Sequence, residues 1–296
     1  MTDIRVVGPS TFKNILFVTD FSSSSEMALP HAIALAAAYG GNVYIGHVIA
    51  PQLYELVPPD FVPEVLKQST AYARKRMERM INGANFGTVP HEALLEQGEL
   101  WETLRRMVDQ YGIDVIALGT GGRRGLQEVL MGSIAEEILR LTHRPVLTVG
   151  PQSREVPPEG EPRCILLAND FSANCLRAVA CADSLARKFG ARLISLHVAL
   201  EAPEDPEIAT RLEQFFLQRL EQSLDVAAFP KGQLEFRVEF GVPADSILKL
   251  ASGDDVDLIV MGVRGARSVV RATCHLGTNA YQVVSEARCP VLAVTN

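Results

Sequence analysis

The sequence predicts two doubly wound α/β domains in tandem, each built on a five-stranded parallel sheet. The chain has 296 residues, which is enough for two domains of ordinary size. Residues 14–48 recur at 164–198 with a constant offset of 150 and no gap. Within each copy, apolar runs without strict alternation are separated by helical patterns. This combination is typical of a parallel sheet that helices cover on both faces.

The first copy supplies the elements in order. Strands are expected at 15–19, 43–49, 92–96, 115–118 and 146–149. An Ala-rich helix is expected to begin at the serines after Asp20 and to end at Tyr39, before the Gly40-Gly41 stop. Further helices are expected near 62–81, between Gly98 and Tyr111, and at 134–141. Right-handed crossovers then give a doubly wound sheet, which binds ligands at the carboxyl ends of its strands.

The repeat also sets the domain boundaries. Asp20-Phe21-Ser22 recurs as Asp170-Phe171-Ser172, and His47-Val48 recurs as His197-Val198. The offset is 143 further on and 145 near the end, so the second copy lost seven residues and later gained two. We expect domain 1 at 1–150, a Pro- and Glu-rich linker at 151–162, and domain 2 at 163–296.

Composition excludes several classes of protein. The net charge of −7 argues against general binding of nucleic acid, which favours a basic face. No apolar run approaches the roughly 20 residues that cross a membrane, and the N-terminus has no secretion signal, so a cytoplasmic protein is expected. The five cysteines lie in the second half without a CxxC pair, which favours buried thiols over disulfides or zinc.

A glycine-rich loop follows the fourth strand of the first copy with the spacing G-x2-G-x9-G-S. Its motif residues are Gly119, Gly122, Gly132 and Ser133. Glycines let backbone N–H groups approach an anion, and the free N–H groups of the helix that opens at Ser133-Ile134 favour phosphate. Arg123 and Arg124 could add charge-assisted contacts. The loop is neither a Walker loop nor a dinucleotide fingerprint, because its spacing and its place after the fourth strand differ from both.

Together these residues resemble the ATP-binding members of the universal stress protein family. Those members carry G-x2-G-x9-G-[ST], an Asp after the first strand and a His-Val at the end of the second, and residues 14–148 contain all three. The resemblance implies a Rossmann-like, adenine-nucleotide-hydrolase-like fold that binds ATP, with Mg²⁺ on its phosphates. It places Asp20 by the nucleoside and the Val48 backbone on adenine. The phosphates would lie on Gly119, Gly122, Gly132 and Ser133, beside Ile134.

The second copy departs from this pattern. Asp170 and Val198 remain, but Gly262 and Gly265 are followed by eleven residues before Gly277-Thr278. The two added residues lengthen the loop that must surround the phosphates. We therefore expect the second copy to bind nucleotide weakly, in another pose, or not at all.

Three functions fit these patterns. The first is an ATP-binding cytoplasmic stress-response or signalling protein, with the nucleotide held mainly in domain 1. The second is a nucleotide-free scaffold, in which the copies pair through their sheet edges as an intramolecular pseudo-dimer, with or without a further homodimer, and act on a protein partner. The family resemblance implies that the fifth strands exchange or pair. The third is an enzyme that acts on a phosphoanhydride. No nucleophile or base at recognisable spacing supports it, so at most slow ATP hydrolysis is expected.

Each residue also has a plainer interpretation. Asp20 and Asp170 could cap the following helices. His47 and His197 are interpreted as oriented core or rim histidines rather than as catalytic bases. Cys175 and Cys181 are expected to pack in the core. The basic residues 74–76, with Arg79, are interpreted as a solvated helix face.

Overall fold

The computed structural model describes residues 12–50, 54, 57–121, 133–154, 160–173, 175–263 and 278–295. These residues form two compact units, Thr11–Gly119 and Thr120–Asn296. Several predicted residues of the glycine loops lie outside the described part of the chain: Gly122, Arg123, Arg124, Gly132, Gly265 and Gly277.

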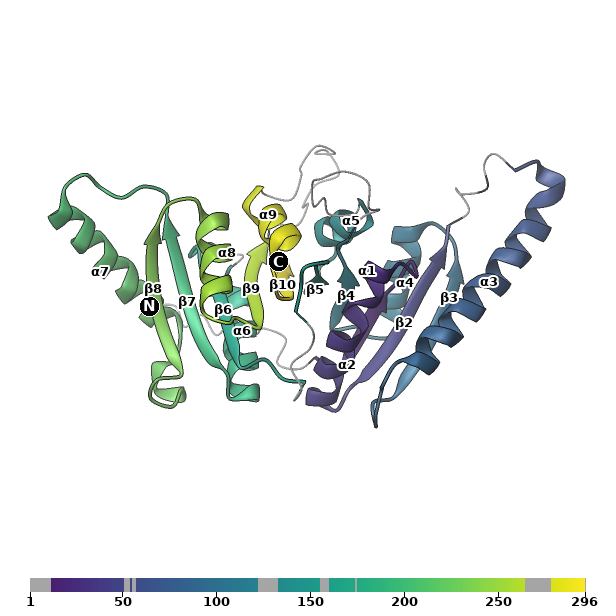
Figure 1. The fold of residues 1–296 in the computed structure, drawn as a ribbon, viewed down its shortest axis with the longest axis horizontal. Coiled ribbons are helices and arrows are strands. Elements are labelled where there is room, and N and C mark those ends of the chain that lie inside the picture. Colours follow the sequence, from purple (N-terminus) through teal and green to yellow (C-terminus); the bar gives the residue numbers. More distant parts are fainter. Residues whose placement is uncertain are drawn as a thin grey trace. The chain divides into compact units, whose positions relative to one another are not determined.

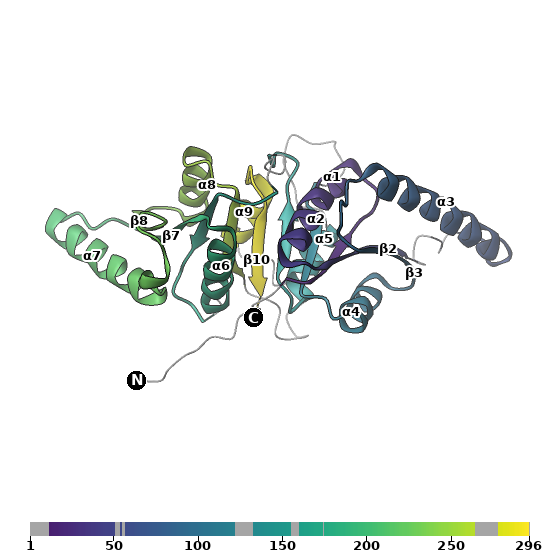
Figure 2. The same cartoon turned by 90° about the horizontal axis from the view of Figure 1, so that it is seen from below.

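The unit Thr11–Gly119 contains four parallel strands in the order β3-β2-β1-β4. The strands are β1 (Asn14–Val18), β2 (Asn42–Ile49), β3 (His91–Gln97) and β4 (Val115–Gly119). The helices are α1 (Ser23–Glu26), α2 (Ala28–Tyr39), the 3-10 helix η2 (Pro59–Phe61), α3 (Val62–Gly83) and α4 (Leu100–Gln110). Figures 1 and 2 show α2 and α3 on one face of this sheet and α4 on the other, as doubly wound topology requires.

Local signals explain where these elements begin and end. The side chain of Ser22 caps α1 by accepting a hydrogen bond from Ser25 N at 3.1 Å. Gly40 ends α2 in the left-handed conformation, with φ at 58°. The apolar run of β1 is almost entirely buried, because β1 lies between β2 and β4 and helices cover it on both faces.

The unit Thr120–Asn296 contains six strands in the order β5-β10-β9-β6-β7-β8. The strands are β5 (Val146–Val149), β6 (Cys164–Ala168), β7 (Arg192–Ala199), β8 (Leu234–Phe240), β9 (Leu258–Val263) and β10 (Val291–Thr295). The helices are α5 (Ser133–Leu141), α6 (Cys175–Phe189), α7 (Pro206–Ser223), the 3-10 helix η3 (Val226–Ala228), α8 (Pro243–Gly253) and α9 (Thr278–Glu286). Strands β6 to β10 are parallel and repeat the strand order of the first copy.

Strand β5 belongs to the first copy of the repeat but pairs with β10 of the second. The pairing is antiparallel, and Leu147 lies opposite Leu292, its equivalent at the offset of 145. The hydroxyl of Thr148 donates to Val291 O at 3.1 Å. The expected pairing of the fifth strands is therefore confirmed.

The predicted fold class is confirmed, and so is the packing of the thiols. Cys164, Cys175, Cys181 and Cys289 are free and buried. Burial raises the pKa of Cys175, Cys181 and Cys289 to about 12, so these thiols stay protonated and unreactive at neutral pH. None of the described helices is long and apolar enough to cross a membrane.

Candidate functional site

The candidate site of the first copy lies where the strand order of its sheet reverses. Strand β1 pairs with β2 on one side and with β4 on the other. Asp20 follows β1, Val48 is the second-last residue of β2, and Gly119 ends β4. The structure thus brings three of the predicted residues to one edge of the sheet, the edge at which doubly wound proteins bind ligands.

The hydrogen-bond ladder between β1 and β2 stops just before Val48. Thr19 N donates to Gly46 O at 3.0 Å. A regular parallel ladder would continue from Val48 N to Thr19 O and from Phe21 N to Val48 O. Side chains take these positions instead. Nδ1 of His47 bonds Thr19 O at 2.7 Å, and Phe21 N donates to the Thr19 hydroxyl at 2.9 Å. The backbone N–H and C=O of Val48 therefore lie beyond the end of the ladder and point past β1.

His47 is an orienting residue in this arrangement. Because a carbonyl oxygen only accepts, the bond to Thr19 O places the proton of the neutral ring on Nδ1. Burial lowers the pKa of His47 and outweighs the opposing effects of Thr19 O and Asp20, so the ring is neutral at pH 7. The ring also contacts Phe21, with 4.3 Å between centroids. The interpretation of His47 as an oriented histidine is therefore supported.

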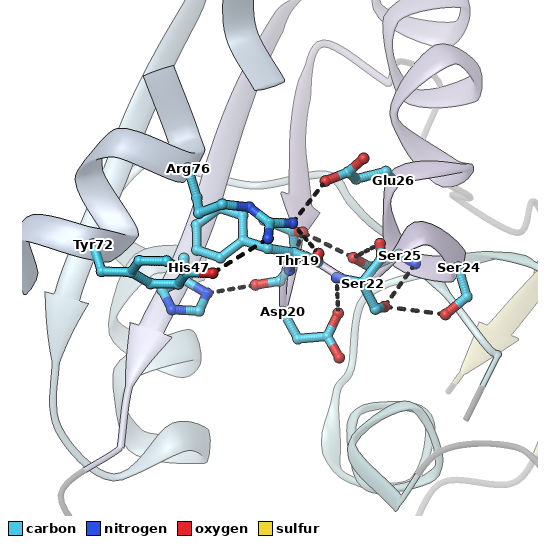
Figure 3. Close-up of polar contacts among 10 residues, drawn as sticks. Thr19, Asp20, Ser22, Ser24, Ser25, Glu26, His47, Tyr72 and Arg76 are labelled. Atoms are coloured by element: carbon cyan, nitrogen blue, oxygen red, sulfur yellow. Dashed lines mark hydrogen bonds and ion pairs between the residues drawn. The ribbon is translucent and has the colours of Figure 1, made fainter. Parts of the chain in front are cut away.

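Phe21 turns the chain away from β1 at a strained position. Its φ is 60°, in the left-handed region, where a bulky side chain costs roughly 1–2 kcal/mol. Arg76 of α3 holds it there, because the guanidinium donates to Phe21 O and lies 5.6 Å from the ring centroid. Arg76 also pairs with Glu26 at 3.5 Å and bonds the Tyr72 hydroxyl at 3.4 Å (Figure 3).

This role of Arg76 corrects the interpretation of residues 74–76 as a solvated face at one position only, since Arg74, Lys75 and Arg79 are exposed as expected. The guanidinium joins α3 to the loop that follows β1, rather than extending into solvent. Sequence reasoning missed it, since its partner Phe21 lies 55 residues away. The signal that could have found it is the matching arginine at position 219, at the offset of 143 that relates the later parts of the two copies.

Asp20 shapes the turn before α1 but does not cap the helix. Its carboxylate accepts from Ser22 N at 2.9 Å, and the cap itself is Ser22. Asp20 is exposed, and Figure 3 shows its carboxylate bonded to the loop that follows it. Partial burial raises the pKa of Asp20, but hydrogen bonds from Ser22 and Ser25 outweigh this effect and leave the pKa below its ordinary value. Asp20 is therefore an ionised acceptor at neutral pH.

Gly119 is required by packing inside the protein. A Cβ at this position would lie 2.0 Å from Ser24 O and 2.7 Å from the Cα of Ser25. The start of α1 therefore approaches the end of β4 so closely that only glycine fits. The next residue, Thr120, is buried, and its hydroxyl has no hydrogen-bond partner among the described residues.

The second copy repeats the terminated ladder. Asn169 N donates to Leu196 O at 2.8 Å, and Nδ1 of His197 bonds Asn169 O at 2.8 Å. Phe171 N donates to the Asn169 side chain at 3.0 Å, and φ of Phe171 is 57°. The backbone groups of Val198 therefore occupy the same position past β6 as those of Val48 past β1.

The remaining predicted residues of the second copy follow the same plan. Asp170 accepts from Ser172 N at 2.9 Å, as Asp20 does from Ser22. Gly262 lies within β9, and Thr278 opens α9, as Ser133 opens α5. Ile134, the second residue of α5, is exposed. The side chains of Ser133 and Thr278 lie outside the described part of the structure. Within that part, no group of three or more His, Cys, Asp and Glu side chains could hold a metal ion.

These features define a tandem α/β protein of the doubly wound class, with a terminated β-ladder at each switch point. The chain belongs to the universal stress protein family, which matches residues 11–150 and again 162–295. A universal stress protein of Thermus aquaticus is 39% identical over 137 residues, which cover 45% of this chain and 98% of the relative. One from Mycolicibacterium smegmatis is 24% identical over 299 residues and matches 98% of this chain and 99% of its own length.

A solved structure has the same fold along almost the whole chain. The crystal structure of a universal stress protein from Archaeoglobus fulgidus superposes with a TM-score of 0.70, covering 95% of this chain and 98% of that one. The sequence identity is 21%, so this likeness concerns the fold alone.

Proposed function

We propose that the first copy binds ATP and that the protein acts as a nucleotide-dependent stress or signalling protein of the cytoplasm. The observation that carries this proposal is the pair of backbone groups that Val48 presents past the end of β1. Adenine offers an amino donor beside a ring acceptor on one edge. One N–H and one C=O of the same residue match that edge.

The surrounding groups fit the rest of the nucleotide. The carboxylate of Asp20 is exposed and ionised, so it can accept hydrogen bonds from ribose hydroxyls. The phosphates would lie on the loop from Gly119 through Gly122 and Gly132 to Ser133, where α5 begins. A helix N-terminus favours phosphate oxygens. Mg²⁺, when bound, would neutralise charge on the phosphates, where it commonly keeps water ligands.

Binding without rapid hydrolysis follows from what the site residues already do. His47, the nearest histidine to Val48 in the sequence, donates its Nδ1 proton to Thr19 O and orients the loop. Asp20 is held by the backbone of Ser22. A nucleotide that binds one of two conformations more tightly shifts the population of the protein between them, and that shift can be read by a partner.

Isothermal titration of the purified chain with ATP and Mg²⁺ tests the proposal. We expect one strong site per chain, and we expect Gly132→Val to abolish it because a branched side chain would obstruct the approach of phosphate. Gly83→Ala is the matched control, since no atom lies within 4 Å of its added Cβ. Absence of ATP binding by the unmodified chain would contradict the proposal.

The nucleotide-free scaffold remains the second candidate, because β5 and β10 already join the two copies of the repeat. Mass spectrometry of small molecules released from the purified, denatured protein separates the two candidates. Co-purified adenine nucleotide supports the binding protein. Its absence, together with no ATP binding in titration, supports the scaffold.

A further inference from the structure

Helices α3 and α7 correspond residue by residue at the offset of 143. Met77 and Leu220 are equivalent and are both buried, with 3% and 0% of their surfaces exposed. Arg76 and Arg219 are also equivalent. They lie over equivalent phenylalanine rings, at 5.6 Å from the centroid of Phe21 and 4.1 Å from that of Phe171. The two copies therefore contain the same stack of arginine, phenylalanine and histidine.

One position in this stack differs between the copies. Phe216 of α7 lies 4.3 Å from the ring of His197 and 6.1 Å from that of Phe171, nearly parallel to the latter at 11°. Its equivalent in α3 is Ala73, which has only a methyl group. This difference between Phe216 and Ala73 is accompanied by a difference in how exposed the two histidines are. His197 is buried, at 9% exposed, whereas His47 is only half-buried.

The histidine rings border the position that the proposed function gives to the nucleobase. Each ring reaches over the end of the first strand of its copy to a backbone carbonyl, at 2.7 Å for His47 and 2.8 Å for His197. Those bonds are the ones that leave the next residue, a valine, without a ladder partner. A planar base that bonds to this valine therefore lies beside the histidine ring, where it can stack on exposed aromatic surface.

We propose that Phe216 excludes the nucleobase from the second copy by occupying the ring position beside His197, and that the buried Ala73 places no ring beside His47, which stays half-buried. The inference rests on the proposed function and names one residue by which the base positions of the two copies differ. The proposed effect of Phe216 concerns the base position alone and is therefore independent of the longer phosphate loop of the second copy.

Adenosine is the appropriate probe, because it lacks phosphates and reports only on the base and ribose positions. The full chain, labelled with ¹³C on its six histidines, is titrated with adenosine while the imidazole resonances are followed by NMR. His47→Gln and His197→Gln assign the two relevant signals. In the unmodified chain we expect the His47 signal to shift and the His197 signal to stay.

Phe216→Ala is the decisive variant, because it only removes atoms. We expect it to make the His197 signal respond to adenosine, with affinity at least about fivefold above that of the unmodified second copy. Phe215→Ala is the matched control, since Phe215 is 52% exposed and is in contact with Phe216 but not with His197. Phe216→Leu replaces it if the alanine variant melts below the temperature of the titration.

Ala73→Phe tests the first copy. We expect it to weaken adenosine binding at His47 by about tenfold, the loss of one stacking contact. Ala71→Phe adds the same ring to an exposed position of α3 and should leave binding unchanged. The inference is overturned if His197 responds in the unmodified chain, or if it stays silent in both Phe216 variants while His47 responds. If His47 itself never responds to adenosine, the base position assigned by the proposed function is wrong as well.

Discussion

Replacing Gly119 with alanine should destabilise the protein even without a ligand. The added Cβ would lie 2.0 Å from Ser24 O and 2.7 Å from the Cα of Ser25, and both atoms belong to the backbone. Overpacking of this kind costs about 1–3 kcal/mol, and contact with backbone that cannot rotate away places the variant at the upper end. One kcal/mol corresponds to about 4 °C in a unit of the size of Thr11–Gly119, so Tm should fall by roughly 12 °C.

Thermal denaturation followed by circular dichroism, in buffer free of nucleotide, measures this shift. Gly83→Ala provides the control, because its added Cβ would meet no atom within 4 Å. A glycine needed only for the approach of phosphate would leave the Tm of the ligand-free protein unchanged. If Gly119→Ala melts together with Gly83→Ala, the packing role assigned to Gly119 is refuted.

Three further predictions concern the terminated ladder. Thr19→Val should lower the free energy of unfolding, measured in urea, by about 1–3 kcal/mol, because the buried Phe21 N–H loses its acceptor. Thr19→Ser keeps the hydroxyl and should behave nearly as the unmodified chain. Arg76→Met should cost about 1 kcal/mol in the same assay, whereas a methionine at the exposed, neighbouring Arg79 should cost almost nothing; equal effects would contradict the bridging role of Arg76. Burial lowers the pKa of both His47 and His197, so the unfolded chain binds more protons and the free energy of unfolding should fall as pH drops from 7 to 5. Urea titrations at several pH values should show a weaker dependence of this free energy on pH when both histidines are replaced by glutamine. An unchanged pH dependence would contradict this assignment.

The sequence was sufficient to predict the elements because their signals are local and are repeated. Each predicted strand of the first copy agrees with the structure to within about a residue at either end, and the helix after β1 ends at Tyr39 as predicted. The apolar runs have the length of buried strands, and Gly40 marks a left-handed cap. Because the elements recur in the second copy, each copy provided a check on the other, which a single-copy sequence would not allow.

The chemistry of the site was only partly predictable. Asp20 and Val48 could be placed because they end strands, and strand ends follow from apolar runs. The groups that terminate the ladder could not be predicted, since this depends on Thr19 and His47 reaching particular backbone atoms. The packing role of Gly119 could not be predicted either, because Ser24 lies 95 residues earlier in the chain and only the fold brings the two residues together.

The register between β5 and β10 has a consequence for how the two copies can change. Since Leu147 meets Leu292, its own equivalent, the contact has the form of a symmetric homodimer interface in which each residue would face itself. In a homodimer every substitution appears on both sides at once. In one continuous chain the partners are always the two different halves, held at an effective concentration in the millimolar range or above whatever the amount of protein. Either half can therefore acquire a substitution that the other lacks, as the pair Phe216 and Ala73 illustrates.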